Sequence, residues 1–228
     1  MKRSDSSAES NNDVSALQMT QPPQLRADAD YALYKDWLLN NFYDHLCSYC
    51  LVQHESLEVE HYEPGQYAPN RKSDPANLLL SCRRCNGGKS DYHPKFKKRR
   101  SRRRDQHGFE IIDVRRDNLA DLFELTAGGQ LAPKRGPQLD RAVWNALVLK
   151  LDTKWVLERR KECLQILELC EQLIRRDETT VEMYLRPLLP MCAKQSLIYK
   201  VFDIPVSEAL KRRIDNFIKD NRPILTVA

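Results

Sequence analysis

The chain has 228 residues, of which 41% are hydrophobic and 30% are charged, and its formal net charge is +5. No apolar run approaches the roughly 18 residues that a membrane span needs, so we expect no membrane partner. The start, MKRSDSSAESNND, lacks the apolar core of a secretory signal, which together with seven cysteines predicts a reducing, cytoplasmic location where thiols bind metal or stay reduced.

The positive charge is concentrated in one segment. Residues 71–104 hold 13 Lys or Arg residues and two acidic residues, a net charge of +11, which leaves −6 for the rest of the chain. Within this segment the run KFKKRRSRRR, residues 95–104, has eight basic residues out of ten. Such focused charge predicts contact with a polyanion, although a solvated tail or a localisation signal has the same composition.

In chain order, the first expected elements are a polar arm at residues 1–27 and an amphipathic helix at 28–46. The helix prediction rests on apolar residues that recur every three or four positions, namely Tyr31, Leu33, Tyr34, Trp37, Leu38 and Phe42. Residues 47–85 contain short runs broken by Pro and Gly, which predicts a β-hairpin, an irregular loop and a helix that begins near Asn86.

The rest of the chain is expected to be mainly helical. FEIIDV, residues 109–114, is predicted as one strand, and Gly128, Gly129, Pro133, Gly136 and Pro137 mark loops. Apolar residues at helical spacing predict helices at 139–149, 154–176 and 207–221, with Ser207 as an N-cap. Cys163, Cys170 and Cys192 lie in these apolar patterns and are expected in the core.

Two C-x2-C pairs, CSYC at 47–50 and CRRC at 82–85, are separated by 31 residues. Four thiolates presented from two tight turns suit the tetrahedral coordination of Zn²⁺, which stabilises small modules that lack a large core. We therefore predict a structural zinc ion bound by Cys47, Cys50, Cys82 and Cys85. Ordinary buried thiols are one alternative, which the pairing of two knuckles in a reducing compartment disfavours. Redox thiols are another, which the missing βαβ context disfavours.

Polar residues between and after these pairs suggest a second site. Glu60 and His61 stand side by side in a β-like run, Asn77 follows sixteen residues after His61, and Asn86 follows Cys85 directly. If zinc clamps the two pairs together, the strand with Glu60 and His61 folds back over the helix near Asn86. We therefore expect Glu60, His61 and Asn86 to come together.

The runs VEHYEP and NLLLSCRRCNGGKS resemble the HNH (ββα-metal) endonuclease family, in the variant with Asn in the third signature position and flanking zinc knuckles. The resemblance covers about 47–92. It implies an α+β, mostly helical chain in which a ββα-metal module stapled by the four-cysteine zinc site precedes a helical C-terminal region. We divide the chain into the arm at 1–27, the nuclease module at 28–105 and the helical region at 106–228.

The resemblance also implies roles for single residues. His61 would be the general base, while Glu60 and Asn86 would hold a catalytic Mg²⁺ or Mn²⁺ through oxygen. Asn77 would hydrogen-bond the backbone near His61, and Lys89 would contact a phosphate. Glu60 stands where Asp is frequent and Asn86 where His is frequent, which leaves the preferred ion open. The residues expected to grip nucleic-acid phosphates are Lys95, Lys97, Lys98, Arg99, Arg100, Arg102, Arg103 and Arg104.

A looser resemblance follows the site. LTAGGQLAP, residues 125–133, and LDRAVWNALVLKLDTKWVLERRKE, residues 139–162, are similar to the region after the zinc knuckles in PtuB-like HNH proteins of Septu-type and retron-linked antiphage systems. This resemblance implies a role in antiphage defence and an SMC or ABC-like ATPase partner (PtuA-like).

The sequence thus favours a metal-dependent endonuclease that acts on DNA or RNA. The alternative from another class is a zinc-dependent nucleic-acid-binding or adaptor module that cuts nothing. Such a binder needs none of Glu60, His61 and Asn86, so these residues discriminate between the two. A stand-alone restriction or homing nuclease is disfavoured because no helix-turn-helix reader is apparent.

Overall fold

The computed structural model describes residues 22–23, 31–41, 46–54, 56–92, 109–175, 188, 198, 201–202 and 204–225. The elements of the N-terminal part are η1 Tyr31–Tyr34, α1 Lys35–Asn41, β1 Glu58–His61, η3 Pro69–Arg71, η4 Pro75–Asn77, β2 Leu78–Ser81 and α2 Arg83–Lys89. Those of the C-terminal part are α3 Leu119–Leu122, β3 Phe123–Leu125, β4 Leu131–Pro133, α4 Leu139–Val148, α5 Lys154–Arg175 and α9 Glu208–Leu225. The mixed α+β class and the helical C-terminal region are as predicted.

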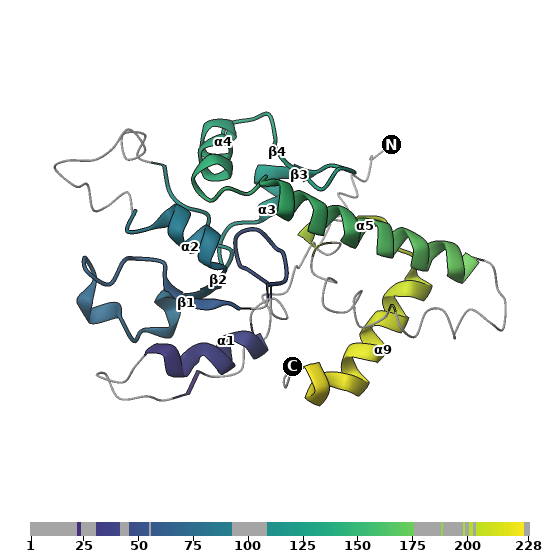
Figure 1. Cartoon of the computed structure of the whole chain (residues 1–228), viewed down its shortest axis with the longest axis horizontal. Helices are drawn as coiled ribbons and strands as arrows, with labels where there is room; N and C mark the ends of the chain where they lie inside the picture. The colour runs from purple at the N-terminus through teal and green to yellow at the C-terminus, as the bar shows by residue number, and fades with distance from the viewer. Residues whose placement is uncertain are drawn as a thin grey trace, which may run out of the picture.

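The centre of the N-terminal part is the predicted hairpin. β1 and β2 pair antiparallel, so that Glu58 lies opposite Ser81 and His61 opposite Leu78. In Figure 1, α2 lies on one side of this hairpin and α1 on the other. All four residues of β2 are buried; α1 packs against β2, while α2 packs against β1. The predicted hairpin and the helix that contains Asn86 are both present, but the irregular loop expected after the hairpin lies between its two strands, and β2 leads directly into α2.

The expected helix at 28–46 is only partly described. Within it, Tyr31–Tyr34 forms a 3-10 turn and Lys35–Asn41 an α-helix, and Tyr34 and Leu38 face the core at consecutive helical spacing. The remaining positions of that prediction lie outside the described residues. The predicted arm at 1–27 also lies outside them, apart from residues 22–23.

The strand predicted at 109–114 is wrong. These residues are all described, and they run as an extended chain that enters a turn without pairing to a strand. A side chain takes the place of a strand partner: Asn145 Oδ1 accepts from Ile112 N at 3.0 Å, and Asn145 Nδ2 donates to Glu110 O at 3.0 Å. The apolar run is buried, as a strand would be, but its backbone is satisfied by α4.

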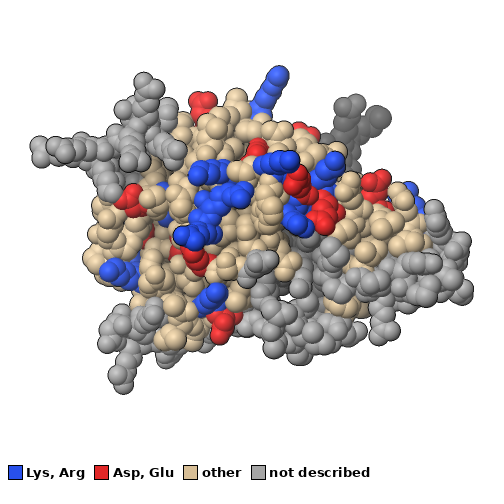
Figure 2. Space-filling model, in the orientation of Figure 1, with Lys and Arg blue, Asp and Glu red and all other residues tan. Residues whose placement is uncertain are grey.

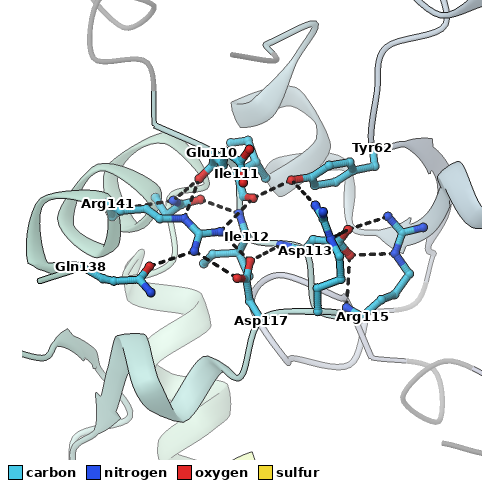
Figure 3. Close-up of polar contacts among 11 residues, drawn as sticks. Tyr62, Glu110, Ile111, Ile112, Asp113, Arg115, Asp117, Gln138 and Arg141 are labelled. Atoms are coloured by element: carbon cyan, nitrogen blue, oxygen red, sulfur yellow. Dashed lines mark hydrogen bonds and ion pairs between the residues drawn. The ribbon is translucent and has the colours of Figure 1, made fainter. Parts of the chain in front are cut away.

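The same segment carries a polar network that reaches the residue after β1 (Figure 3). The Tyr62 hydroxyl donates to Ile111 O at 2.9 Å, while the Asp113 carboxylate accepts from Arg115 Nε at 2.7 Å and Arg116 Nε at 2.9 Å. Both guanidinium groups lie over the Tyr62 ring, with Cζ at 5.5 and 5.6 Å from its centroid. Burial raises the pKa of Tyr62 to about 12. The network ties the end of β1 to the C-terminal part.

The β3–β4 hairpin was not predicted. Its strands have three residues each, too few for alternation to be visible in the sequence. Gly129 in the connecting turn has φ +81°, and a Cβ there would lie 2.5 Å from Leu157 O. The turn therefore requires glycine both for its backbone conformation and for its close approach to α5.

The helices α4, α5 and α9 agree with the predictions at 139–149, 154–176 and 207–221. Leu210 N donates to Ser207 Oγ at 3.2 Å, which confirms Ser207 as the N-cap of α9. Cys163 and Cys170 are buried in the core as expected, whereas Cys192 lies outside the described residues. None of the helices in the described ranges is both long enough and apolar enough to cross a membrane.

One apolar cluster runs through both parts of the chain, from Tyr34 in η1 to Ile214 in α9. Arg160 of α5 strengthens this connection, because its buried guanidinium donates to three backbone carbonyls: Cys50 O at 3.0 Å, Gly129 O at 2.8 Å and Leu151 O at 2.6 Å. Asp152 Oδ1 lies 3.3 Å from its Nη1. The first zinc knuckle is thus attached directly to α5. The proposed boundary near residue 105 lies outside the described residues and stays a prediction.

Candidate functional site

The four cysteines of the two knuckles form one buried cluster. Their Sγ atoms all lie within 4.8 Å of one another, and none forms a disulfide. A tight turn at residues 48–50 presents the first pair, helped by the positive φ of Leu51 (55°). Cys82 caps the N-terminus of α2, which brings in the second pair.

The surroundings act on the thiols of this cluster in opposite directions: burial raises the pKa of Cys50, and hydrogen bonds with the neighbouring thiols, above all Cys47, raise the pKa of Cys85. Cys47 Sγ accepts from Cys82 N at 3.3 Å, and Cys82 Sγ accepts from Cys85 N at 3.5 Å. Hydrogen bonds from the neighbouring thiols, above all Cys47, lower the pKa of Cys82. His54 Nε2 lies 3.4 Å from Cys50 Sγ. Cys85 Sγ instead donates to Leu149 O at 3.4 Å. Four buried sulfur donors, two of which accept from backbone N–H groups, fit a structural Zn²⁺, so the donor set matches the predicted ion.

Glu60 lies inside the module. Its side chain is 3% exposed, and its Oε1 accepts from the Tyr49 hydroxyl and from Lys89 Nζ, both at 2.8 Å. Burial and the Glu60 charge raise the pKa of Tyr49, so its hydroxyl remains a donor. Glu60 Oε2 is buried and has no hydrogen-bond partner among the described residues. A buried carboxylate oxygen without a partner requires a further donor or a cation.

Lys89, which we expected to contact a phosphate, is buried inside the module. Its side chain is 1% exposed, and Nζ binds Glu60 Oε1 and donates to His61 O at 2.8 Å. Because the buried Glu60 carboxylate needs a counter-charge, α2 supplies it from its last turn. The structure therefore assigns Lys89 to the interior of the module, where it links Glu60 to the backbone of His61.

His61 is half-buried at the end of β1. Its Nε2 lies 2.9 Å from Lys72 O, and its ring meets Tyr31 edge-on with centroids 4.5 Å apart. Because a carbonyl only accepts, Nε2 carries the proton and Nδ1 of the neutral ring has a lone pair. Burial lowers the pKa of His61, and the charge of Lys89 lowers it further. The neutral imidazole, which is the form of a general base, is thereby favoured.

Asn77 organises the loop between β1 and β2. It is fully buried; Oδ1 accepts from Glu63 N at 2.7 Å, and Nδ2 donates to Glu63 O at 3.0 Å and to Arg71 O at 3.1 Å. Glu63 follows His61 by two residues, and Arg71 precedes Lys72, the partner of the His61 ring. Asn77 thus holds both ends of the loop around His61, although its predicted catalytic role remains a prediction.

Asn86 meets a carboxylate to which the sequence reasoning gave no role. Its Nδ2 donates to Glu58 Oε2 at 2.9 Å rather than to Glu60. Glu58 and Glu60 are two residues apart in β1, so both side chains leave the strand on the face toward α2. That two-residue spacing was the signal that could have identified Glu58. The carboxylate oxygens of Glu58 and Glu60 and the amide oxygen of Asn86 are the kind of ligand that a hard divalent cation prefers.

The three expected site residues do not converge as predicted. Successive strand residues point to opposite faces, so His61 faces η1 while Glu60 faces α2 together with Asn86. The structure therefore brings Glu60 and Asn86 to one face of β1 and His61 to the other. The basic residues expected to grip phosphates, residues 95–104, lie outside the described residues.

Among known families, residues 47–92 match the model described as HNH endonuclease. The match begins at the first knuckle cysteine and ends just after α2, so it contains both strands and every described residue of the candidate site. Searches of curated proteins and of solved structures each returned no match. The segment that resembles an HNH endonuclease domain, which indicates a nuclease, is thus the one built on the four-cysteine cluster.

Proposed function

We propose that the chain is a metal-dependent endonuclease that hydrolyses phosphodiester bonds of DNA or RNA, with His61 as its general base. One observation carries the assignment. Within the segment that matches the HNH family, the His61 ring is held by Lys72 O so that its basic Nδ1 carries no proton. A structural histidine needs no such lone pair, whereas a group that takes a proton from water does.

The chain's own residues divide the work around this histidine. His61 accepts the proton of the attacking water at Nδ1, while Asn77 and the Lys72 carbonyl hold the ring's orientation. Lys89 forms an ion pair with the buried Glu60 and donates to the backbone carbonyl of His61. A divalent ion held by Glu60 and Asn86, with Glu58 beside them, would stabilise negative charge on the phosphate and the leaving oxygen.

The opposite faces of His61 and the carboxylates are compatible with this chemistry. In an in-line displacement, the attacking water and the leaving oxygen lie on opposite sides of the phosphorus. A base on one face of β1 and oxygen ligands on the other satisfy that requirement, provided that the phosphate lies beyond the end of the strand.

One observation favours the alternative, a non-catalytic zinc-dependent binding module. The Glu60 carboxylate is buried and already neutralised by Lys89, as in a purely structural ion pair. If that pair is structural, replacing Glu60 affects stability alone. An activity assay combined with a stability measurement therefore separates the two functions.

The test compares zinc-loaded His61→Ala with the parent chain on labelled single-stranded DNA, duplex DNA and RNA, in Mg²⁺ and in Mn²⁺. We expect loss of cleavage by about 100-fold or more, because general-base catalysis typically contributes that much. Zinc content and melting temperature should remain those of the parent. Cleavage at the parental rate would contradict the base assignment, and a parent chain that cuts nothing in either ion would support the binding module.

The antiphage role and the ATPase partner are finer proposals that rest on residues 125–133 and 139–162 alone. The family match ends before them, and in the structure they form the β3–β4 hairpin, α4 and the first turns of α5. This part also contains Arg160, whose guanidinium joins α5 to the first knuckle at Cys50 O and to the β3–β4 turn at Gly129 O. A structural role of these residues within the chain is therefore enough to account for the resemblance, and no partner protein is needed to explain it. Co-purification of an ATPase with the chain from its native source would support the partner.

A further inference from the structure

A groove of about 900 Å³ lies beside the zinc cluster, between the segment after the first knuckle, the first turn of α2 and α5. None of the residues that line it belongs to the candidate catalytic set. The lining residues used below are His54, Arg83, Arg84, Trp155, Arg159 and Glu162.

The groove is basic. Among its lining residues three are arginines and one, Glu162, is acidic, and that carboxylate is paired with Arg159 Nη1 at 2.7 Å. Arg83 is exposed and makes no hydrogen bond or ion pair with the residues that the structure describes. Figure 2 shows basic side chains gathered on this face of the molecule, over the region between α2 and the beginning of α5. Such a groove attracts a polyanion.

An aromatic ring stands among these charges. The Trp155 ring is only partly buried, with Arg84 Cζ at 5.7 Å and Arg159 Cζ at 5.8 Å from its centroid. The His54 ring lies 4.8 Å from it, tilted by 42°. Arg84 is held by the Thr153 hydroxyl, whereas the Arg159 side chain is 52% exposed. Interleaved guanidinium groups and aromatic faces suit phosphates joined by unpaired bases.

We propose that this groove binds a single-stranded stretch of nucleic acid, with an unpaired base stacked against Trp155 and phosphates on Arg83, Arg84 and Arg159. The proposal rests on the proposed nuclease function, because it names the form of the same substrate. Arg83 precedes Asn86 by three residues in α2, so the two side chains are neighbours on the helix surface. A strand that leaves the groove at Arg83 therefore reaches the candidate catalytic face.

The experiment measures binding by the zinc-loaded full chain carrying His61→Ala, so that cleavage does not interfere. Fluorescence anisotropy is recorded at several salt concentrations with labelled single-stranded DNA, single-stranded RNA and duplex DNA of one sequence. Either single strand should bind more tightly than the duplex, and the two single-stranded arms show which sugar is preferred. Equal binding of duplex and single strands would overturn the proposal.

Charge variants test the phosphate contacts. Arg83→Gln and Arg159→Gln should each weaken binding and reduce the dependence of log K on log salt by about 0.7 per lost phosphate. Lys154→Gln is the matched control, because its side chain in the first turn of α5 is 91% exposed and does not line the groove. If all three variants bind like the parent, or lose affinity equally, the proposal fails.

Trp155 variants test stacking. Trp155→Leu keeps an apolar side chain but removes the π face, so binding should weaken about tenfold. Trp155→Phe should retain most of the affinity while losing the tryptophan fluorescence quenching that accompanies binding. Because Trp155 packs against the core, the melting temperature of each variant is measured. If Trp155→Leu is unfolded, the binding affinity of the exposed Arg83→Gln variant decides whether the groove binds nucleic acid. Binding by folded Trp155→Leu that equals binding by the parent would overturn base recognition. Displacement of the strand by poly-glutamate as readily as by nucleic acid would also overturn it and would indicate an acidic protein partner.

Failure of this proposal and failure of the nuclease proposal are distinguishable. If the parent cuts nucleic acid while the groove variants bind and cut as the parent does, the groove assignment falls and the nuclease stands. If single strands bind through Trp155 and Arg83 but the parent chain cuts nothing, the groove stands and the nuclease falls.

Discussion

The zinc module, residues 46–92, and the helical region, residues 109–225, are stabilised by different means. In the module the strands have four residues each, long loops connect the elements, and the four thiols belong to the buried cluster. In the helical region, α5 alone has 22 residues and buries an apolar stripe that includes Leu167 and Cys170. Short elements bury little apolar surface, and the four-cysteine cluster offers a site where an ion would add stability to the module.

The two regions also differ in the polar and charged side chains that they bury. The module places charged and polar groups in its interior, such as Glu60, Lys89 and Asn77, and hydrogen bonds and an ion pair satisfy them there. The helical region buries few such groups among its described residues, and one of them, Arg160, points at the first knuckle. Buried polar and charged side chains therefore occur in both regions, with more of them in the module. The following predictions test this contrast.

Loss of zinc should have the largest effect. Structural zinc contributes on the order of 10 kcal/mol to small modules, which is comparable with the whole stability of a typical domain. We expect Cys82→Ser, or removal of the ion by a chelator, to abolish the cooperative unfolding transition of the module, as measured by circular dichroism and by zinc content. Activity should be lost only as a consequence.

Cys170→Ser is the matched control, because this thiol is buried in α5 and does not belong to the cluster. It should keep one zinc ion per chain and lose about 1–3 kcal/mol from burial of a hydroxyl. If the chain has the same melting temperature with and without a chelator, the module does not depend on zinc, and the proposed difference between the two regions is wrong.

Arg160→Met tests the attachment between the regions. The variant leaves the carbonyls of Cys50, Gly129 and Leu151 without their donor, and we expect a loss of about 3 kcal/mol or more in the free energy of unfolding. Urea denaturation monitored by tryptophan fluorescence measures it. Arg175→Met, at the exposed end of α5, should change stability by about 0.5 kcal/mol or less. Equal effects of the two substitutions would show that the attachment is not at Arg160.

Asn77→Ala tests the loop around His61. Removing three hydrogen bonds from a buried amide should cost about 2 kcal/mol and should also reduce cleavage, because the loop that carries Lys72 O loosens. Asn118→Ala is the control: it removes an exposed helix cap and should cost about 1 kcal/mol with cleavage unchanged. Should Asn77→Ala lose stability but cut at the parental rate, its positioning role would be excluded.

The smallest effect concerns acid stability at Asp113. Burial alone would raise the pKa of this carboxyl, but the hydrogen bonds and charge of Arg115 outweigh burial and lower the pKa below its ordinary value of 3.8. A lowered folded-state pKa adds stability above the unfolded value, and this stability is lost as the pH falls through the folded value. Asp113→Asn should therefore cost about 1 kcal/mol at neutral pH.

The deficit of Asp113→Asn should shrink when melting is measured at a pH below 3.8. The control, Asp121→Asn, alters an exposed carboxylate in α3 and should change melting little at any pH. A deficit that stays constant from neutral to acidic pH would show that the Asp113 charge does not contribute.

Particular elements show how far sequence reasoning reached. The knuckles, the presence of the hairpin and the three long helices were predicted because their signals are local: cysteine spacing, Pro and Gly punctuation, and apolar periodicity. The place of the irregular loop, between the strands rather than after them, was not. The strand expected at 109–114 was wrong because burial of Ile111 and Ile112 looks the same whether a strand or the side chain of Asn145 satisfies the backbone. The β3–β4 hairpin was missed because three-residue strands carry no measurable pattern.

The candidate site shows the same limit. Glu60, His61, Asn77 and Asn86 were singled out from their order along the chain, yet their contacts differed from expectation. Lys89 turned inward to Glu60, and Asn86 bonded to Glu58, because α2 packs across β1 in one particular register. The groove at Trp155 was not predicted, since its walls come from three separate segments.

By itself, the sequence determined which residue types are available for each role. It supplies four thiols at metal-binding spacing, an imidazole beside a carboxylate, and helices with apolar stripes. These are properties of neighbours along the chain, and short-range geometry is sufficient to read them. Tertiary structure alone decided which groups meet. Lys89 reaches the backbone of His61 across 28 residues and Arg160 reaches that of Cys50 across 110, and contacts over such separations depend on packing that no local pattern contains.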